Sequence, residues 1–380
     1  MRLPSSLTVR RFRIEGAPIE PDRALALLEK RRFATDLPVP TEGDLKGWTS
    51  FGNFLDAEPD ASWIASGRLF FGLRVDKRKP NSALLRAKCA IEEKIRRDAS
   101  GKAVLPARIR KEIKEEISRD ILETTPPSHS HYAAIWQFHR QEIHLLSGSA
   151  SVADLFREEF RVTFDRKLTT LRPAWRARTL DLPASSVSAL DNYHPVSFAG
   201  SHDLEPPVDE FELHRHLGRE FLTWLWYRID ETGGDFQWPD LGRYGMMVGE
   251  SLVLDGDELD ATKDSFRGGA PAEAVEAGAA LAAAKKVSQM RVLVARDEAE
   301  WRGTITAATL DVGGLKVPKT EAKDAHEVLD DQLSGLEEWI KVQDRLFKDF
   351  LVLRLGPEWR QHVEAVRTWV ASHRGEPVLA

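Results

Sequence analysis

The chain has 380 residues and a single cysteine, Cys89. One cysteine excludes an intramolecular disulfide and any cysteine-rich zinc or iron–sulfur site, and this usage is typical of a reducing cytosol. We interpret Cys89 as a small residue at a helix interface. The chain also lacks an apolar run close to the roughly 18 residues that a membrane span needs, and its first residues contain no apolar stretch of the secretory kind. We therefore expect a cytoplasmic protein that does not enter a membrane.

Signatures of enzyme and cofactor sites are missing as well. The sequence has no Walker A loop, no GxGxxG after a predicted strand, no GxSxG elbow and no HExxH helix. His129 and His131 fall on one side of an extended segment, and Asp255 and Asp257 belong to an acidic stretch whose spacing differs from that of an EF-hand loop. We expect no cofactor and no bound metal. A metal-dependent enzyme that uses these four residues stays an open alternative.

Large apolar side chains, in contrast, are plentiful. The chain is 42% hydrophobic and 30% charged, with 11 Trp and 17 Phe. These values are ordinary for a globular chain with buried cores, and the length favours two or three compact units.

Hydrophobic periodicity predicts both strands and helices. Strands are predicted at residues 7–14, 63–65, 68–75, 133–138, 142–146, 287–295 and 300–308. Helices are predicted after residue 21, from 81 to a break at 98–101, after 106, and at 151–164, 211–229, 270–284, 325–350 and 357–372. The stretch 180–208, rich in Pro, Ser and His, is the best candidate for a domain junction. This order predicts an α+β fold with mixed sheets and packed helices.

Two consecutive helices differ from the rest because each combines a narrow apolar stripe with charged flanks. The stripe of the first consists of Leu84, Ala87, Ile91 and Ile95, and that of the second consists of Ile109, Ile113, Ile117 and Ile121. So narrow an apolar face predicts a projecting helical hairpin rather than a pair of core helices.

Charge is unevenly distributed along the chain. The formal net charge is −6, with a pI near 6.1, which excludes a uniformly basic surface. Residues 77–119, however, hold 14 Lys and Arg against six Asp and Glu, a local net charge of +8. Residues 157–178 hold seven against three, a local net charge of +4. The remaining residues are therefore strongly acidic.

A hairpin with basic flanks can follow a phosphate backbone, because each Lys or Arg near a phosphate releases condensed counterions without reading a base. Such binding is independent of sequence and sensitive to salt. The alternative is that Glu92, Glu93, Glu112, Glu115 and Glu116 pair with neighbours at i+3 and i+4 spacing and leave only a solvated face. Composition leaves both interpretations open.

The order of these features resembles the RdgC family of bacterial recombination-associated DNA-binding proteins. The similarity runs through Gly47 and Trp48, the strands at 63–75, the helical pair that begins at Lys79 and ends near Leu122, and the helix at 152–164. It resumes at 272–281, 288–295, 301–316 and 348–353. It thus covers most of the chain as a pattern with scattered identities, without a short diagnostic motif.

The resemblance implies a protein that is not an enzyme. It implies a ring-shaped homodimer whose basic interior surrounds double-stranded DNA, associated with the nucleoid and restraining RecA filaments in recombination and replication. A basic channel in an acidic body agrees with the charge distribution. Single-stranded DNA is a further expected partner. The alternative is an accessory factor, related to phage or defence, that docks an acidic protein through the basic hairpin.

On this basis the DNA-binding candidates are basic residues of the two positive stretches. They are Lys77, Arg78, Lys79, Arg86, Arg96, Arg97, Lys102, Arg108, Lys111 and Lys114, with Arg161, Arg166, Arg172 and Arg176 as secondary candidates. The expected regions are an N-terminal α/β part (1–76), the basic hairpin (77–123), a strand pair and helix (124–180), a second α/β region with an acidic tip (181–320) and C-terminal helices (321–380).

Overall fold

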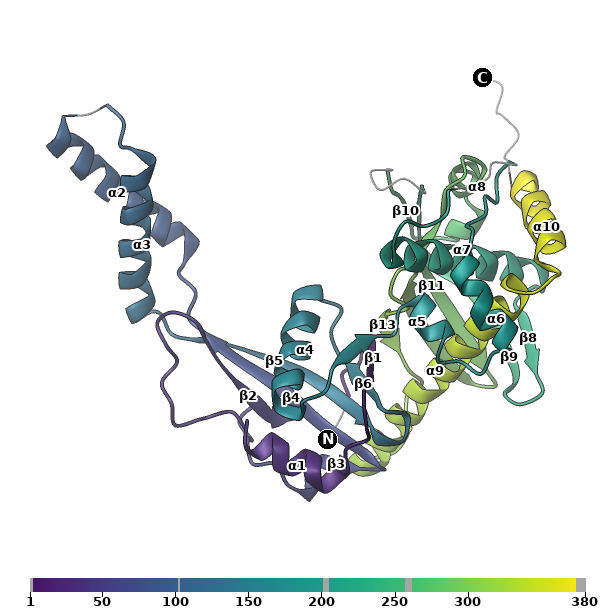
Figure 1. The fold of residues 1–380 in the computed structure, drawn as a ribbon, viewed down its shortest axis with the longest axis horizontal. Helices are drawn as coiled ribbons and strands as arrows, with labels where there is room; N and C mark the ends of the chain where they lie inside the picture. Colours follow the sequence, from purple (N-terminus) through teal and green to yellow (C-terminus); the bar gives the residue numbers. More distant parts are fainter. Residues whose placement is uncertain (1–2, 102, 201–204, 257–261, 374–380) are drawn as a thin grey trace. The chain divides into compact units, whose positions relative to one another are not determined.

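A computed structural model of the protein describes residues 3–101, 103–200, 205–256 and 262–373 (Figure 1). Contacts divide the chain into two compact units, and each unit is assembled from segments that are separate in the sequence. Unit 1 comprises Met1–Glu15, Glu142–Ala153 and Leu168–Ala380, whereas unit 2 comprises Gly16–Gln141 and Asp154–Lys167. Both units combine helices with antiparallel strands, which confirms the prediction of an α+β fold.

Unit 2 is built on a small antiparallel sheet. Its strands are β2 (Asp44–Ser50), β3 (Ile64–Ala65), β4 (Arg68–Lys77) and β5 (Ser128–Gln137). Strand β4 is central, because β2 pairs with one of its edges and β5 with the other. Its helices and 3-10 turns are α1 (Pro21–Glu29), η1 (Ala61–Trp63), η2 (Phe138–Arg140) and most of α4 (Ala150–Phe164). Figure 1 shows α1 and α4 on opposite faces of this sheet, so nearly all of β4 is buried.

An aromatic cluster joins the sheet of unit 2 to α4. The rings of Trp48 and Phe71 lie 5.2 Å apart, and both contact Phe156 of α4, at 5.5 and 5.9 Å. The indole of Trp48 also donates to Thr163 Oγ1 at 2.8 Å. Burial of large rings whose polar atoms are satisfied is the main stabilising contribution here.

Unit 2 also carries the two helices predicted as a hairpin, α2 (Ser82–Ser100) and α3 (Ala107–Thr124), which pack against each other. Asn81 caps α2, since its side chain accepts from the amides of Ala83 and Leu84. Gly101 ends α2 in the left-handed region, with φ of +64°. Figure 1 shows the pair extending away from the end of the unit 2 sheet.

Unit 1 contains a larger antiparallel sheet with the strand order β10-β9-β11-β12-β13-β1-β6. These strands are β1 (Leu7–Ile14), β6 (Glu142–Leu145), β9 (Gly242–Asp255), β10 (Asp264–Arg267), β11 (Lys286–Arg296), β12 (Ala299–Thr306) and β13 (Val312–Lys316). Two short strands pair at its sides, β7 (Leu168–Thr170) with β1 and β8 (Asp235–Trp238) with β9.

Helices cover one face of this sheet. They are α5 (Pro173–Ala177), α6 (Ala184–Ala189), η3 (Leu190–Asn192), α7 (Glu210–Glu231), η4 (Pro271–Glu273), α8 (Val275–Ala282), α9 (Ala325–Arg354) and α10 (Trp359–Ser372). Helix α7 packs closely against the sheet at Gly218. A side chain there would collide with the carbonyl oxygen of Ala307, so the close approach requires glycine. Helix α9 is tied to β12, since the Trp301 indole donates to the Gly335 carbonyl at 2.8 Å. On the opposite face, Met247 of β9 is 65% exposed.

Three segments differ from the expectation. The 14-residue strand β9 lies in a segment for which the sequence pattern predicts no strand. The 270–284 helix is reduced to α8, with η4 before it. The stretch 180–208 contains α6 and η3 and buries Tyr193 and Phe198 inside unit 1, because these rings pack against residues of α9 and α10. No helix in the described part of the chain is both long and apolar enough to cross a membrane.

Candidate nucleic-acid interface

The basic residues selected from the sequence fall in both units. In unit 2, Lys77 ends β4, Arg78 and Lys79 connect β4 to α2, and the others lie on α2 (Arg86, Arg96, Arg97), on α3 (Arg108, Lys111, Lys114) and in or after α4 (Arg161, Arg166). Arg172 and Arg176 belong to unit 1. Lys102 lies outside the described residues.

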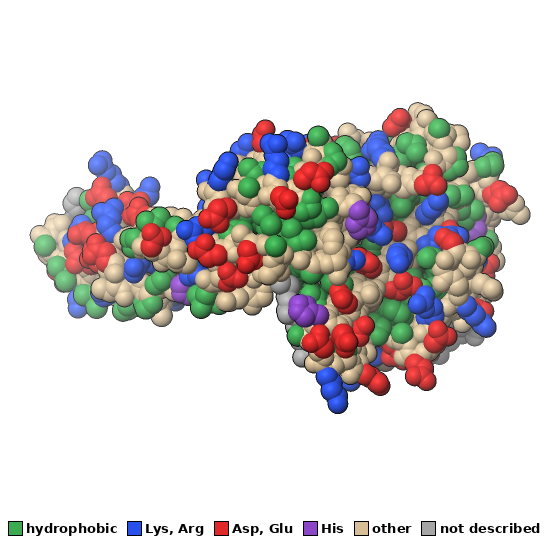
Figure 2. All heavy atoms as spheres, turned by 90° about the horizontal axis from the view of Figure 1, so that it is seen from below, with side chains coloured by type: hydrophobic (Ala, Val, Ile, Leu, Met, Phe, Trp, Pro, Cys, Tyr) green, Lys and Arg blue, Asp and Glu red, His purple; other side chains and the backbone are tan. Residues whose placement is uncertain are grey.

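Some hairpin cations are paired with carboxylates, most of which lie on the same two helices. Arg96 contacts Glu92 at 2.8 Å and Glu116 at 2.7 Å, and these hydrogen bonds raise the pKa of its guanidinium. The other pairs join Arg97 to Asp98 at 3.9 Å, Arg108 to Glu112 at 3.0 Å, Lys111 to Glu115 at 3.6 Å and Arg119 to Glu42 at 3.5 Å. Figure 2 shows acidic and basic side chains side by side over the pair, at the left. For these residues the arrangement is that of the alternative in which glutamates pair with neighbouring cations and leave a solvated face.

Other hairpin cations have no carboxylate partner. Within the described residues, no Asp or Glu lies at ion-pair distance from seven exposed side chains, namely Lys77, Lys79, Arg86, Lys88, Lys94, Arg110 and Lys114. Lys88, Lys94 and Arg110 are not among the candidates chosen from the sequence. What these three share with the other four is that no carboxylate of the described residues contacts them. Only the packed structure of the two helices shows which cations have such a contact. Together with Arg78, these seven residues are the described hairpin cations that no carboxylate contacts.

Arg78 has a structural role at the base of the hairpin. Its Nη1 donates to the carbonyl of Thr125 at 2.5 Å and to that of Leu122 at 3.3 Å, and its Nε donates to the carbonyl of Val39 at 3.4 Å. A cation at the end of a helix satisfies orphan carbonyls and interacts favourably with the helix dipole. Arg78 therefore holds the end of α3 against the body of unit 2.

The secondary candidates are largely engaged with the protein. Arg161 pairs with both oxygens of Glu158, and Arg166 donates to the carbonyls of Ala17 and Asp165. Arg172 has a buried Nε without a hydrogen-bond partner. Arg176 is only 8% exposed and contacts Glu142 and Asp344 within unit 1. We leave Arg176 out of the proposed interface, because a guanidinium so buried and compensated cannot reach a phosphate.

The histidine pair of β5 lies in a polar cluster on unit 2. Arg74 donates from Nε and Nη2 to the two oxygens of Asp76, at 2.9 and 2.6 Å, and His129 Nδ1 is 2.9 Å from Asp76 Oδ2. Burial raises the pKa of Asp76, but the bonds from Arg74 and His129 outweigh it and hold that pKa below its ordinary value. The ring of Phe54 contacts those of His129 and His131.

These contacts bear on the alternative of a metal site. Asp255, at the end of β9, contacts Arg219 at 2.6 Å, and Asp257 lies outside the described residues. The described part of the chain contains no group of three or more His, Cys, Asp or Glu side chains arranged to hold a metal ion.

The apolar stripe of α2 is turned away from α3. Leu84, Ile91 and Ile95 are 45%, 62% and 56% exposed, whereas Ile113 and Ile121 of α3 are buried. The residues that α2 turns toward its partner are half-buried ones such as Cys89. Helix α2 therefore presents an uncovered apolar face beside its cations.

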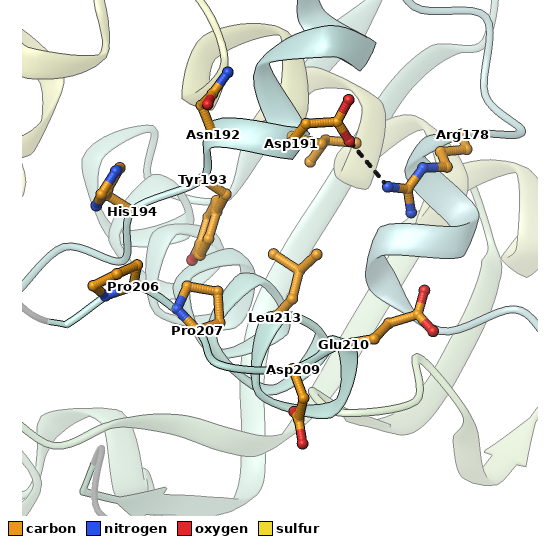
Figure 3. A pocket seen from close by; sticks show the side chains of 11 residues that line it. Arg178, Asp191, Asn192, Tyr193, His194, Pro206, Pro207, Asp209, Glu210 and Leu213 are labelled. Carbon is orange, nitrogen blue, oxygen red and sulfur yellow. Dashed lines mark hydrogen bonds and ion pairs between the residues drawn. The ribbon is translucent and has the colours of Figure 1, made fainter.

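A hollow in unit 1 has a different character. It encloses about 500 Å³ between the 190–194 segment and the start of α7 (Figure 3). Arg178 on its wall pairs with Asp191 at 3.3 Å, and Asp209 and Glu210 add two further carboxylates. This mixture of charges does not suit a phosphate backbone.

Comparison with known proteins adds no family assignment: the chain matches no protein-family model, and no curated protein matches it significantly.

Proposed function

We propose that this protein binds double-stranded DNA independently of sequence, as a homodimer of the RdgC type, and acts without catalysis of its own. In this proposal the dimer is a ring with a basic channel, located in the cytoplasm at the nucleoid, and DNA binding modulates recombination and replication that depend on RecA. The charge of the hairpin and the family resemblance together support it. Single-stranded DNA is a second candidate ligand of the same surface.

The observation that carries the proposal is the set of seven exposed hairpin cations without a carboxylate partner. A surface whose cations are all paired with carboxylates attracts a polyanion only weakly. Among the described residues, five hairpin cations contact a carboxylate, whereas Lys77, Lys79, Arg86, Lys88, Lys94, Arg110 and Lys114 do not. Each such side chain can neutralise a phosphate and release a counterion. Binding through these residues depends on charge and helix geometry, and no base need be read.

The exposed stripe of α2 supports self-association. This apolar stripe, which includes Leu84, Ile91 and Ile95, runs along a helix that is otherwise charged. Contiguous exposed apolar surface is typical of an interaction site. A second copy of the same helix would cover the strip and bring a second set of cations beside the first.

The direct test is fluorescence anisotropy with two unrelated duplexes over a range of salt concentrations. We expect similar affinities for both and a loss of about 10³- to 10⁵-fold between 50 and 200 mM salt if six to ten phosphates are contacted. No binding at low salt overturns the proposal, and so does a strong preference for one duplex.

The accessory-factor alternative is separated by affinity purification from cells, with and without nuclease. Partners that disappear after nuclease treatment support DNA binding. Acidic proteins that remain bound after nuclease treatment support docking of a protein through the hairpin. Sedimentation or mass measurement in solution then tests the homodimer, and a persistent monomer overturns the ring.

A further inference from the structure

A small hollow at the base of the hairpin is lined by basic side chains without any carboxylate. It encloses about 380 Å³ between the beginning of α2 and the middle of α3. Its charged lining consists of Lys79, Arg86 and Lys114, and its other walls include Ser82, Leu85 and Cys89. All three cations belong to the seven that have no ion-pair partner.

Two other hollows in the described part of the chain differ in this respect. The one in Figure 3 combines Arg178 with three carboxylates, and another beside β12 combines Arg302, Lys316 and Lys319 with Glu298, Glu300 and Glu321. Three like charges around one concavity repel one another and focus a positive potential into it. Folding tolerates that cost most easily where an anion from outside compensates it. The hollow therefore has the charge of an oxyanion site.

The donors match a phosphate group. Ammonium groups from Lys79 and Lys114 and a guanidinium from Arg86 supply charge-assisted hydrogen bonds, and Ser82 adds a hydroxyl. The amides of Ala83 and Leu84 are already occupied by the Asn81 cap, so the side chains form the donor set. Leu85 and Cys89 provide an apolar wall beside these donors.

We propose that this hollow is a phosphate-binding subsite, in which Lys79, Arg86 and Lys114 together hold one phosphate of the nucleic acid backbone. The inference rests on the proposed function for the source of that phosphate. It assigns a common task to three cations from the segment before α2, from α2 and from α3, and it gives the DNA a fixed point of attachment at the hairpin base.

The position of Cys89 in the wall supplies the test, because it is the one thiol of the chain and it is half-buried rather than sealed. The rate of its alkylation by iodoacetamide, a neutral reagent, reports occupation of the hollow. With a duplex present at about ten times its dissociation constant, we expect alkylation to slow about tenfold, since only the free protein reacts. Pyrophosphate alone is the second probe, and protection by it identifies free phosphate compounds as further ligands.

A matched pair of double variants locates the effect. Arg86→Gln with Lys114→Gln removes two cations of the hollow, whereas Arg108→Gln with Lys111→Gln removes two exposed cations that are paired with Glu112 and Glu115. Both carry the same change in net charge. We expect the first to abolish protection of Cys89 and the second to preserve it, with unchanged far-ultraviolet circular dichroism in both.

The salt dependence measures how many phosphates the three residues share. If they hold one phosphate, replacing all three by Gln lowers the slope of log affinity against log salt by about 0.9 for each subunit that contacts the duplex. Contacts to three separate phosphates would lower it by about 2.7 for each such subunit and overturn the shared subsite. Duplex binding without protection of Cys89 overturns the subsite and leaves the proposed function standing. Failure of every duplex to bind removes the proposed function, and pyrophosphate then decides the subsite: protection supports it, and an unchanged alkylation rate overturns it.

Discussion

The guanidinium of Arg11 in β1 donates to both carboxylate oxygens of Asp344 in α9, from Nη1 to Oδ1 at 2.8 Å and from Nη2 to Oδ2 at 3.2 Å. Arg176 donates to the same carboxylate from Nε at 2.9 Å, and Glu142 contacts Arg11 at 2.9 Å and Arg176 at 3.5 Å. The four side chains are at most 14% exposed. Two cations and two carboxylates thus compensate each other inside unit 1 and join its first strand to its longest helix.

Replacing Asp344 by Asn leaves two buried guanidiniums with one carboxylate between them. Removing one member of a buried ion pair typically costs about 3 to 5 kcal/mol, because the remaining charge stays desolvated. We expect a loss of this order in the free energy of unfolding, measured by urea denaturation with tryptophan fluorescence. The control is Glu364→Gln, which breaks the exposed pair with Arg367 and should cost less than about 1 kcal/mol. Equal effects of the two substitutions would contradict the compensated network.

The same network predicts a dependence of stability on pH. Burial raises the pKa of Glu142, but attraction by Arg11, the bond to His144 and attraction by Arg176 outweigh it and hold that pKa far below the ordinary value of 4.5. A carboxyl whose pKa is depressed by folding stabilises the protein above its unfolded pKa, and this contribution disappears as the pH falls through the folded pKa.

The wild type should therefore have a higher free energy of unfolding than Glu142→Gln, and this difference should be largest at pH 7. The difference should stay constant down to about pH 4.5 and narrow progressively at lower pH. Urea titrations at a series of pH values measure it. A difference that grows on acidification would show that Glu142 is not held ionised by its two arginines.

Hairpin cations should divide into two groups when DNA binding is measured. Lys88→Gln and Lys94→Gln remove charges that have no carboxylate partner among the described residues, and each should lower the salt slope by about 0.9 for each subunit that contacts the duplex. Arg108→Gln removes a guanidinium that already bonds Glu112, so its effect on the slope should be smaller. Anisotropy titrations on one duplex at several salt concentrations make the comparison. Equal effects from all three variants would mean that the pairing is irrelevant to binding.

The apolar stripe of α2 should govern self-association without supporting the fold. Ile91→Asp places a charge on a side chain that is 62% exposed, so the monomer should remain folded while sedimentation detects loss of the dimer. Ile113→Ala on α3 removes a fully buried side chain, and we expect it to destabilise unit 2 by about 2 to 5 kcal/mol. A dimer that survives Ile91→Asp would exclude this stripe from the interface.

Local chemistry in the sequence is sufficient to predict the elements with strong, regular signals. The 7–14 strand coincides with β1, and α2 begins directly after Asn81 and stops at Gly101, because a capping side chain and a left-handed glycine act within a few residues. Several ion pairs could also be predicted from the sequence. Arg108 and Glu112, for example, lie four residues apart on one helix, a spacing that brings their side chains together. The excess of positive charge at 77–119 is also a property of the sequence alone.

Tertiary structure decided which charges and which faces remain available. Glu116 reaches Arg96 across the helix pair, and Asp344 reaches Arg176 from 168 residues away, so no local pattern could separate compensated from uncompensated cations. The exposure of the α2 stripe and the position of Arg86 and Lys114 beside one hollow depend on the rotation of α2 about its own axis against α3. That rotation is set by side-chain packing between the helices, which is a property of the folded pair and not of either helix by itself.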